Sequence, residues 1–353
     1  MKRAFGPVVL LVALLAASCA SIGPKTIPRD QFDYGAAISD SSRQQILANI
    51  VGLRYVEAPL FVNVVSVINQ YALEGDVAAG LGTNASVTGK DTVSLGAGAR
   101  WADRPTITYT PVAGRDFAAS LLTPLPPESL FALVQAGWPP ELILRMTVSS
   151  INGVENERGG PSGRSQADPR LVELLQVWGR LRNARVLGLR RDEGEGSSRI
   201  VVYVNERLRD PGVVRDLAFF RETLGLDPDL GEARLTYGLI PDESNEIAVL
   251  TMSILELMNE FAWRIDAPPI HVEEGRTVST FVTEATGVEP LIRIHHAEER
   301  PEYAFVAVEN RDHWFYIDDR DTVSKRTFAL IQILLSLTDT GETARGPVVS
   351  LSN

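Results

Sequence analysis

Residues 77–88 read VAAGLGTNASVT, and residues 92–101 read TVSLGAGARW. In both runs the odd-numbered positions are mostly apolar, while the even-numbered positions hold mainly glycine, serine, threonine and other small or polar residues. An alternation of period two is typical of a β-strand, and the intervening Gly89-Lys90-Asp91 indicates a turn. The stretch therefore predicts a β-hairpin over residues 76–103. A three-residue loop would set its register, with Val87 opposite Val93 and Ala85 opposite Leu95.

This hairpin supports two different hypotheses. Each run has about the length of a membrane-spanning β-strand, about 9–11 residues, so an oligomer could use one hairpin per subunit in a pore or export assembly. Alternatively, the hairpin lies on the core of the protein or projects as a flap. The weak apolar face favours the second hypothesis, because Trp101 is its only aromatic residue.

Helical and strand patterns alternate along the rest of the chain. A helix is expected from Asp40 to Tyr55 because Ile46, Leu47, Ile50, Val51 and Leu53 form an apolar stripe. Further helices are expected near 168–184, 210–224, 250–265 and 322–337, with strands between them. The fold class is therefore α+β, with mixed or antiparallel sheets and packed helices. The expected strands include 61–71, 105–110, 186–190, 199–205, 234–239, 291–296, 302–309 and 313–317.

The beginning of the chain has the composition of an export signal. Lys2 and Arg3 precede an almost wholly apolar run over 5–17, which has the size of a signal-peptide core. Small residues then lead to Cys19, the only cysteine in the sequence. This segment resembles the lipobox of bacterial lipoproteins, which implies cleavage before Cys19 and its acylation. In that family an aspartate after the cysteine directs retention at the inner membrane, so Ala20 implies the outer membrane.

Lipid attachment also predicts where the protein acts. Acyl chains on Cys19 would anchor the mature chain stably, since each buried methylene contributes about 0.8 kcal/mol. We therefore expect a membrane-attached envelope protein that faces the periplasm. The alternative is an ordinary secretory signal cleaved near Ala20.

Composition limits the partners and the cofactors. Residues 1–18 carry two positive charges, so their removal takes the formal charge from −11 to −13. Such an acidic chain does not suit nucleic-acid binding. Once Cys19 is acylated no thiol remains for a disulfide or a cysteine-ligated metal. We expect no cofactor.

A segment rich in glycine, serine and charge, residues 152–167, is the predicted domain boundary. The sequence then divides at that linker into two folded regions. The predicted organisation is a signal peptide (1–18), an anchor and tether (19–31), a helix and β-hairpin domain (32–151), the linker, a C-terminal α+β domain (168–340) and a tail (341–353).

The densest group of polar side chains follows His313. Asp318, Asp319 and Asp321 lie at the end of a predicted strand, where three carboxylates could bind a cation or act as acids and bases. A structural role explains them more simply. Asp321 suits the N-cap of the next helix, and the other two complement its positive end. Arg320, Lys325 and Arg326 can neutralise these charges.

Other catalytic and metal-binding patterns are weak. His295 and His296 could join His271 or His313 at a metal, but adjacent residues of a strand point to opposite faces. The sequence holds no HExxH, GxSxG or SxxK motif. We therefore expect no metal site and a protein that is more readily explained without enzymatic activity.

Two short stretches, 47–55 and 313–321, resemble uncharacterised bacterial lipoproteins of no assigned activity, so the resemblance implies no catalytic residues. The expected function is a structural or interaction role in the envelope, through a protein partner or through self-association. The alternatives are a subunit of a pore or export assembly that contributes residues 76–103, and a hydrolase that uses the 313–321 cluster.

Overall fold

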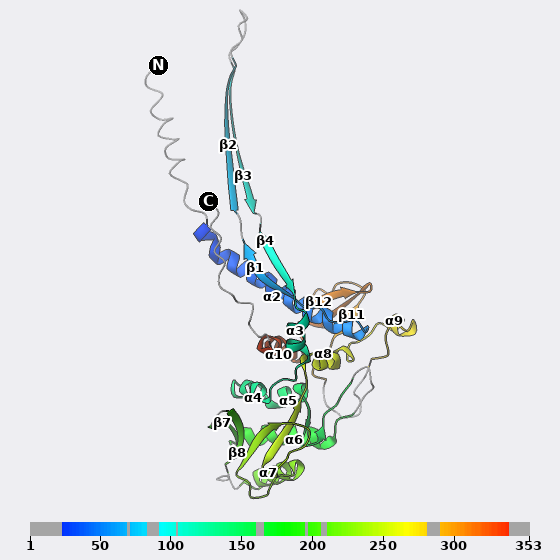
Figure 1. Cartoon of the computed structure of the whole chain (residues 1–353). Coiled ribbons are helices and arrows are strands. Elements are labelled where there is room, and N and C mark those ends of the chain that lie inside the picture. Colours follow the sequence, from blue (N-terminus) through cyan, green and yellow to red (C-terminus); the bar gives the residue numbers. More distant parts are fainter. Residues whose placement is uncertain are drawn as a thin grey trace, which may run out of the picture. The chain divides into compact units, whose positions relative to one another are not determined.

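The structure is a computed structural model that describes residues 23–68, 71–82, 92–103, 105–159, 166–194, 197–205, 210–280 and 290–338 (Figure 1). Its helices and its mixed and antiparallel sheets confirm the predicted α+β class. The chain forms two compact units. The first comprises residues 1–41 and 62–111, and the second comprises residues 42–61 and 112–353.

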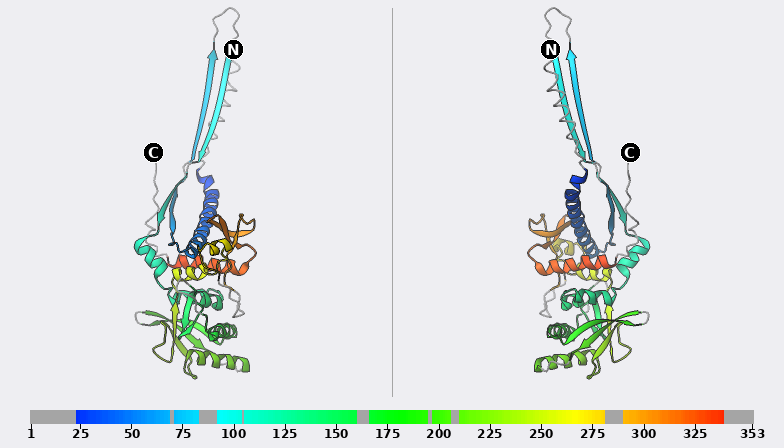
Figure 2. Two further views of the ribbon diagram at one scale, coloured as in Figure 1. Left: turned by 90° about the vertical axis from the view of Figure 1, so that its right-hand side faces the viewer. Right: turned by 90° about the vertical axis from the view of Figure 1, so that its left-hand side faces the viewer.

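The first unit contains a two-stranded ribbon. Strand β1 (Val62–Ile68) pairs with β4 (Thr106–Pro111), and β2 (Tyr71–Gly82) pairs with β3 (Thr92–Asp103), both antiparallel. Ile68 faces Thr106, and three residues further on Tyr71 faces Asp103, so the β1–β4 pair from Ser66 onward has the same register as the β2–β3 pair. The β1–β4 register shifts by one residue between Val64 and Ser66. Figure 2 shows β2 and β3 side by side along their whole length. We call residues 62–111, with these four strands, the ribbon.

The predicted hairpin exists, but its predicted register is wrong. Val93 faces Leu81 and Leu95 faces Ala79, so odd positions do pair with odd positions, as expected, but with partners six residues earlier. The expected partners Ala85 and Val87 lie outside the described residues. Glycine and alanine side chains specify a register weakly. In the β1–β4 pair, larger residues such as Val67 and Ile107 face each other.

Helix α2 (Gly23–Arg54) begins earlier than predicted. Its buried stripe, Ile46, Leu47, Ile50 and Val51, is the predicted one. The expected tether over 19–31 is nevertheless helical from Gly23 onward, through Pro28. Helix propagation adds one hydrogen bond per residue once a turn is formed, so the packed C-terminal half can extend toward the N-terminus.

A six-stranded sheet organises one part of the second unit. Its order is β6-β5-β10-β9-β8-β7, with β9 and β10 parallel and the other neighbours antiparallel. An aromatic group packs beside it, with the Trp178 ring 5.9 Å from Phe131 and 5.4 Å from Phe220. The strands are β5 (Val148–Ile151), β6 (Val154–Glu155), β7 (Leu187–Gly194), β8 (Ser197–Val204), β9 (Glu232–Tyr237) and β10 (Glu246–Thr251). The helices of this part are α4 (Pro127–Gln135), α5 (Pro140–Thr147), α6 (Pro169–Asn183) and α7 (Pro211–Leu224), preceded by α3 (Gly114–Phe117) and the π-helical turn Ala118–Leu122.

The predicted linker does not divide the chain. Its first residues, Asn152 and Gly153, form the turn between β5 and β6, and β5 pairs with β10 from the far side of the segment. Both turn residues have positive φ, 46° and 77°, as a two-residue hairpin of type I′ requires. Because strands from both sides share one sheet, the segment belongs to the second unit.

The second unit also holds a three-stranded antiparallel sheet, ordered β11-β13-β12. The predicted hairpin around residues 310–312 is present, with Arg311 and Asp312 at positive φ. The predicted strand over 291–296 is confined to β11. These elements are β11 (His295–Ala297), β12 (Ala304–Asn310), β13 (His313–Asp318), α8 (Ile254–Ala262), α9 (Pro269–Glu273) and α10 (Thr322–Thr338).

Helix α8 starts later than the periodicity predicts. Leu250 and Thr251 belong to β10, and the helix begins at Ile254. The side chain of Ser253 accepts from the Glu256 amide, while the Glu256 carboxylate accepts from the Ser253 amide. This reciprocal cap defines the start of the helix and releases the preceding apolar residues for a buried strand.

Candidate functional site

The ribbon exposes apolar side chains. All six residues of β4 are exposed, and Tyr109 shows 60% of its surface. Val65, Ile68 and Ile107 are also exposed. Among the described strands, none pairs with the outer edges of β1 and β4. The base of the ribbon therefore presents apolar side chains beside strand edges that no other described strand covers.

Cys19, the expected lipid attachment site, lies outside the described residues. Within the part of the chain that the structure describes, no helix is both long enough and apolar enough to cross a bilayer.

The acidic segment at the start of α10 has capping and ion-pair roles. Asp321 accepts hydrogen bonds from the Val323 and Ser324 amides and from the Ser324 hydroxyl. Partial burial raises the pKa of Asp321, but these hydrogen bonds and the charge of Arg293 outweigh it and leave the pKa below its usual value. Asp321 therefore acts as the predicted helix cap.

The two other carboxylates are each held by a neighbouring cation. Asp318 accepts from the Arg320 guanidinium at 2.6 Å, which holds the pKa of Asp318 below its usual range. Asp319 accepts from Lys325 at 2.6 Å. His313 lies at the opposite end of β13 from Asp318, five residues away along an extended strand, or roughly 16 Å. The expected cluster 313–321 is thus not one site.

We predict that Asp321→Ala lowers the free energy of unfolding by about 1 kcal/mol, the usual cost of removing an N-cap side chain. Asp321→Asn keeps an acceptor and should retain most of the stability. Urea unfolding at neutral pH measures both variants. Equal losses for alanine and asparagine would instead mean that the negative charge matters more than the cap.

His313 belongs to a different group of side chains. Its ring lies 4.7 Å from His271 and 6.2 Å from His296, measured between ring centroids. His271 is buried, and its Nδ1 is 2.7 Å from the Tyr55 hydroxyl. The structure thus joins His271 and His296 to His313, whereas the ring of His295 lies beside Tyr316.

The electrostatics of this group favour neutral imidazole at its centre. Burial lowers the pKa of His271. The nearby His313, Arg276 and Arg311 lower this pKa further, whereas the negative charge of Glu274 raises it and offsets part of the change. The Nδ1 atom of His296 lies 3.2 Å from the Asp266 carboxylate. The Nδ1 atom of His313 lies 3.3 Å from the Arg311 carbonyl oxygen. Among the described residues, no three or more His, Cys, Asp or Glu side chains are arranged so that they could hold a metal ion. What the group provides is a buried tyrosine–imidazole hydrogen bond.

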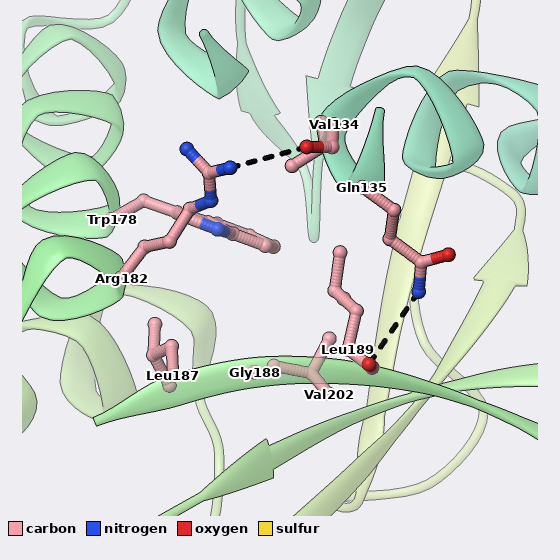
Figure 3. Close-up of a pocket in the computed structure, with 8 residues that line it drawn as sticks. All are labelled: Val134, Gln135, Trp178, Arg182, Leu187, Gly188, Leu189 and Val202. Carbon is pink, nitrogen blue, oxygen red and sulfur yellow. Dashed lines mark hydrogen bonds between the residues drawn. The ribbon is translucent and has the colours of Figure 1, made fainter. Parts of the chain in front are cut away.

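A small apolar cavity of about 110 Å³ lies between α4, α6 and the β7–β8 pair (Figure 3). Two polar side chains line the cavity. Arg182 donates to the Val134 carbonyl at 3.1 Å, and Gln135 donates to the Leu189 carbonyl at 3.5 Å. This volume leaves room for one small apolar group. The remaining lining residues are Val134, Trp178, Leu187, Gly188, Leu189 and Val202.

A second, polar cavity of about 40 Å³ adjoins Glu260. Burial raises the pKa of Glu260 to about 7, although the Gly159 amide donates to its carboxylate and Arg264 lies 3.8 Å away. Glu157, which pairs with Arg264 at 3.1 Å, adds to the rise. Glu260 can therefore exchange a proton near neutral pH. The volume is enough for water molecules bonded to these groups.

Sequence reasoning singled out His313 and the three aspartates but not Tyr55, His271 or Glu260. A signal was present for Glu260, because it lies between Leu257 and Phe261 on the buried face of α8. Tyr55 and His271 come from segments more than two hundred residues apart, so only the fold brings them together.

Comparison with known proteins adds no family to this picture: no family model, no curated protein and no solved structure matches the chain.

Proposed function

We propose that the protein is a lipid-anchored, non-enzymatic component of the bacterial envelope, and that its ribbon associates with further copies of the same chain. The observation that supports this most strongly is the exposure of β4 at the base of the ribbon. All six residues of β4 are exposed, and the exposed set includes Tyr109 and Ile107. The lipobox-like segment at Cys19 supports anchoring in the outer membrane, facing the periplasm.

The energetics of an isolated ribbon support association. A two-stranded hairpin alone is marginally stable in water, and an open edge is a template for another strand. β2 and β3 are 12 residues each, whereas most strands have about 5–6 residues. Pairing between copies would cover the exposed side chains of β1 and β4.

Strand length also favours a specific form of this function, a pore or export assembly. Tilted strands of about 9–11 residues suffice to cross the apolar part of a bilayer, and the paired length of β2 and β3 exceeds this. In such an assembly the second unit of each subunit would remain outside the apolar layer.

We predict that the full-length protein extracted in detergent has the mass of a closed oligomer. Replacing residues 62–111 by a short Gly-Ser turn should reduce it to a monomer, because the whole ribbon is lost. The turn has only a short gap to close, since the Val112 amide donates to the Phe61 carbonyl at 2.8 Å. Native mass spectrometry and light scattering measure the change. Thermal unfolding of the second unit should stay the same in the shortened chain.

A matched control tests whether exposed apolar surface alone causes association. Tyr237 and Ile240 of the second unit are 54% and 70% exposed, so Tyr237→Ser with Ile240→Ser should keep the oligomer. An unchanged mass in the shortened chain would refute association through the ribbon. Cys19→Ala should release the protein from membranes, and continued tight attachment would refute lipid anchoring.

A further inference from the structure

Arg54, the last residue of α2, is buried to an unusual degree for a charged side chain. Only 1% of its surface is exposed. Its Nη2 donates to the Val278 carbonyl at 2.6 Å, and its guanidinium carbon lies 5.2 Å from the centre of the Trp263 ring. Burial lowers the pKa of Arg54, which Tyr55 partly offsets. An arginine nevertheless keeps its proton in proteins, so the buried group is a cation.

Several donors in this contact have no acceptor. Among the described residues, Nε and Nη1 of Arg54 and Nε1 of Trp263 are buried and make no hydrogen bond. Three described carboxylates from neighbouring segments are paired elsewhere: Glu57 with Arg311, Glu274 with Arg276, and Asp266 with His296. The contact thus combines a positive charge with unsatisfied N–H groups from two side chains.

Such an arrangement is costly without an anion. An unpaired buried charge is among the least favourable groups in a protein interior. The aromatic face of Trp263 offsets only part of this cost. An oxyanion would neutralise the guanidinium and accept hydrogen bonds from the open donors.

We propose that Arg54 and Trp263 form a buried binding site for a small oxyanion of the carboxylate or phosphate type. The site is separate from the ribbon and is contained in the second unit. Residues 277–280 cover it. Thr277 donates to the Arg54 carbonyl at 3.1 Å, and Thr280 bonds to Ile265 and Ala267. Val278 is 52% exposed, so this cover is thin. Entry of the anion requires the cover to lift and breaks these few hydrogen bonds.

Thermal unfolding of the full-length protein in sodium phosphate, sodium acetate and sodium chloride at equal ionic strength tests the proposal. An anion present at about 100 times its dissociation constant should raise Tm by roughly 5 °C relative to chloride. Arg54→Met keeps the side-chain length without the charge and should abolish the specific rise. Phosphate also stabilises proteins generally through exclusion from their surface, and the shift that remains in Arg54→Met measures that effect.

Two more variants complete the test. Trp263→Phe keeps the ring but removes the indole N–H, so titration calorimetry should show several-fold weaker binding. Arg190→Gln removes a half-exposed surface charge of the same unit without freeing a carboxylate beside Arg54, and it should bind as the original protein does. A rise with acetate assigns a carboxylate, and a rise with phosphate alone assigns a phosphate.

Equal shifts in the original protein and in Arg54→Met would overturn the proposal. So would the absence of any anion-dependent shift or heat in the original protein, since the buried cation would then be tolerated without a ligand. If Arg54→Met does not fold, Trp263→Phe becomes the deciding variant. An anion affinity of Trp263→Phe equal to that of the original protein would contradict a site formed by Arg54 and Trp263.

Discussion

Replacing Asn152 by alanine is expected to lower the free energy of unfolding by about 3 kcal/mol. The Asn152 side chain donates to the Leu224 and Glu246 carbonyls at 2.6 and 3.2 Å and accepts from the Ala248 amide at 2.6 Å. Each partner left without a hydrogen bond costs about 1–3 kcal/mol when buried, less where water can replace the bond. Asn152 also has a φ of 46°, which alanine adopts less readily. The side chain ties β10 and the end of α7 to the β5–β6 turn.

Asn152→Gly separates the two causes. Glycine accepts a positive φ at no steric cost. The fall in unfolding free energy of Asn152→Gly therefore reports mainly the lost hydrogen bonds, and any further fall in Asn152→Ala reports backbone strain. Urea unfolding of the two variants at one pH measures both terms. A loss below about 1 kcal/mol in both variants would mean that water replaces the side chain at its three partners.

The same turn shows what a sequence pattern can and cannot predict. Asn-Gly between Ile151 and Val154 is a strong signal for a tight hairpin, yet the surrounding glycine, serine and charge predict a linker. The composition of a long segment outweighed a signal confined to two residues. Similarly, the apolar run that ends β10 continues the periodicity of α8, and only the Ser253 cap separates them. Boundaries between adjacent apolar elements depend on such caps.

Local chemistry was predictable at the site candidates, whereas long-range contacts were not. Asp321 lies directly before its helix, so its capping role follows from its position. Arg54 continues the buried stripe of Ile46, Ile50 and Val51, which indicates burial but does not identify Trp263 or Val278 as neighbours. The ribbon shows the same limit: alternation predicted its strands, while small side chains left the register undetermined.

Glu260 should make the protein more stable in mildly acidic than in alkaline solution. The pKa of Glu260 is raised from 4.5 to about 7 in the folded protein, chiefly by burial. A raised pKa means that the folded state holds the proton more tightly than the unfolded chain does. The resulting stabilisation is fully present below about pH 4.5 and is lost as the pH rises through about 7. At about 1.4 kcal/mol per pKa unit, the contribution of Glu260 should fall by about 2 kcal/mol between roughly pH 5.5 and pH 8.5.

Glu260→Gln isolates this contribution. Glutamine resembles the protonated carboxyl group and can still accept from the Gly159 amide, so its stability should change little over the same pH range. The comparison of the two proteins is necessary because the lowered pKa of His271 acts in the opposite sense and weakens the fold as the pH falls below about 6.5. Chemical unfolding at several pH values gives the difference between the original protein and Glu260→Gln. A difference that does not vary with pH would show that Glu260 stays ionised in the folded state, paired with Arg264.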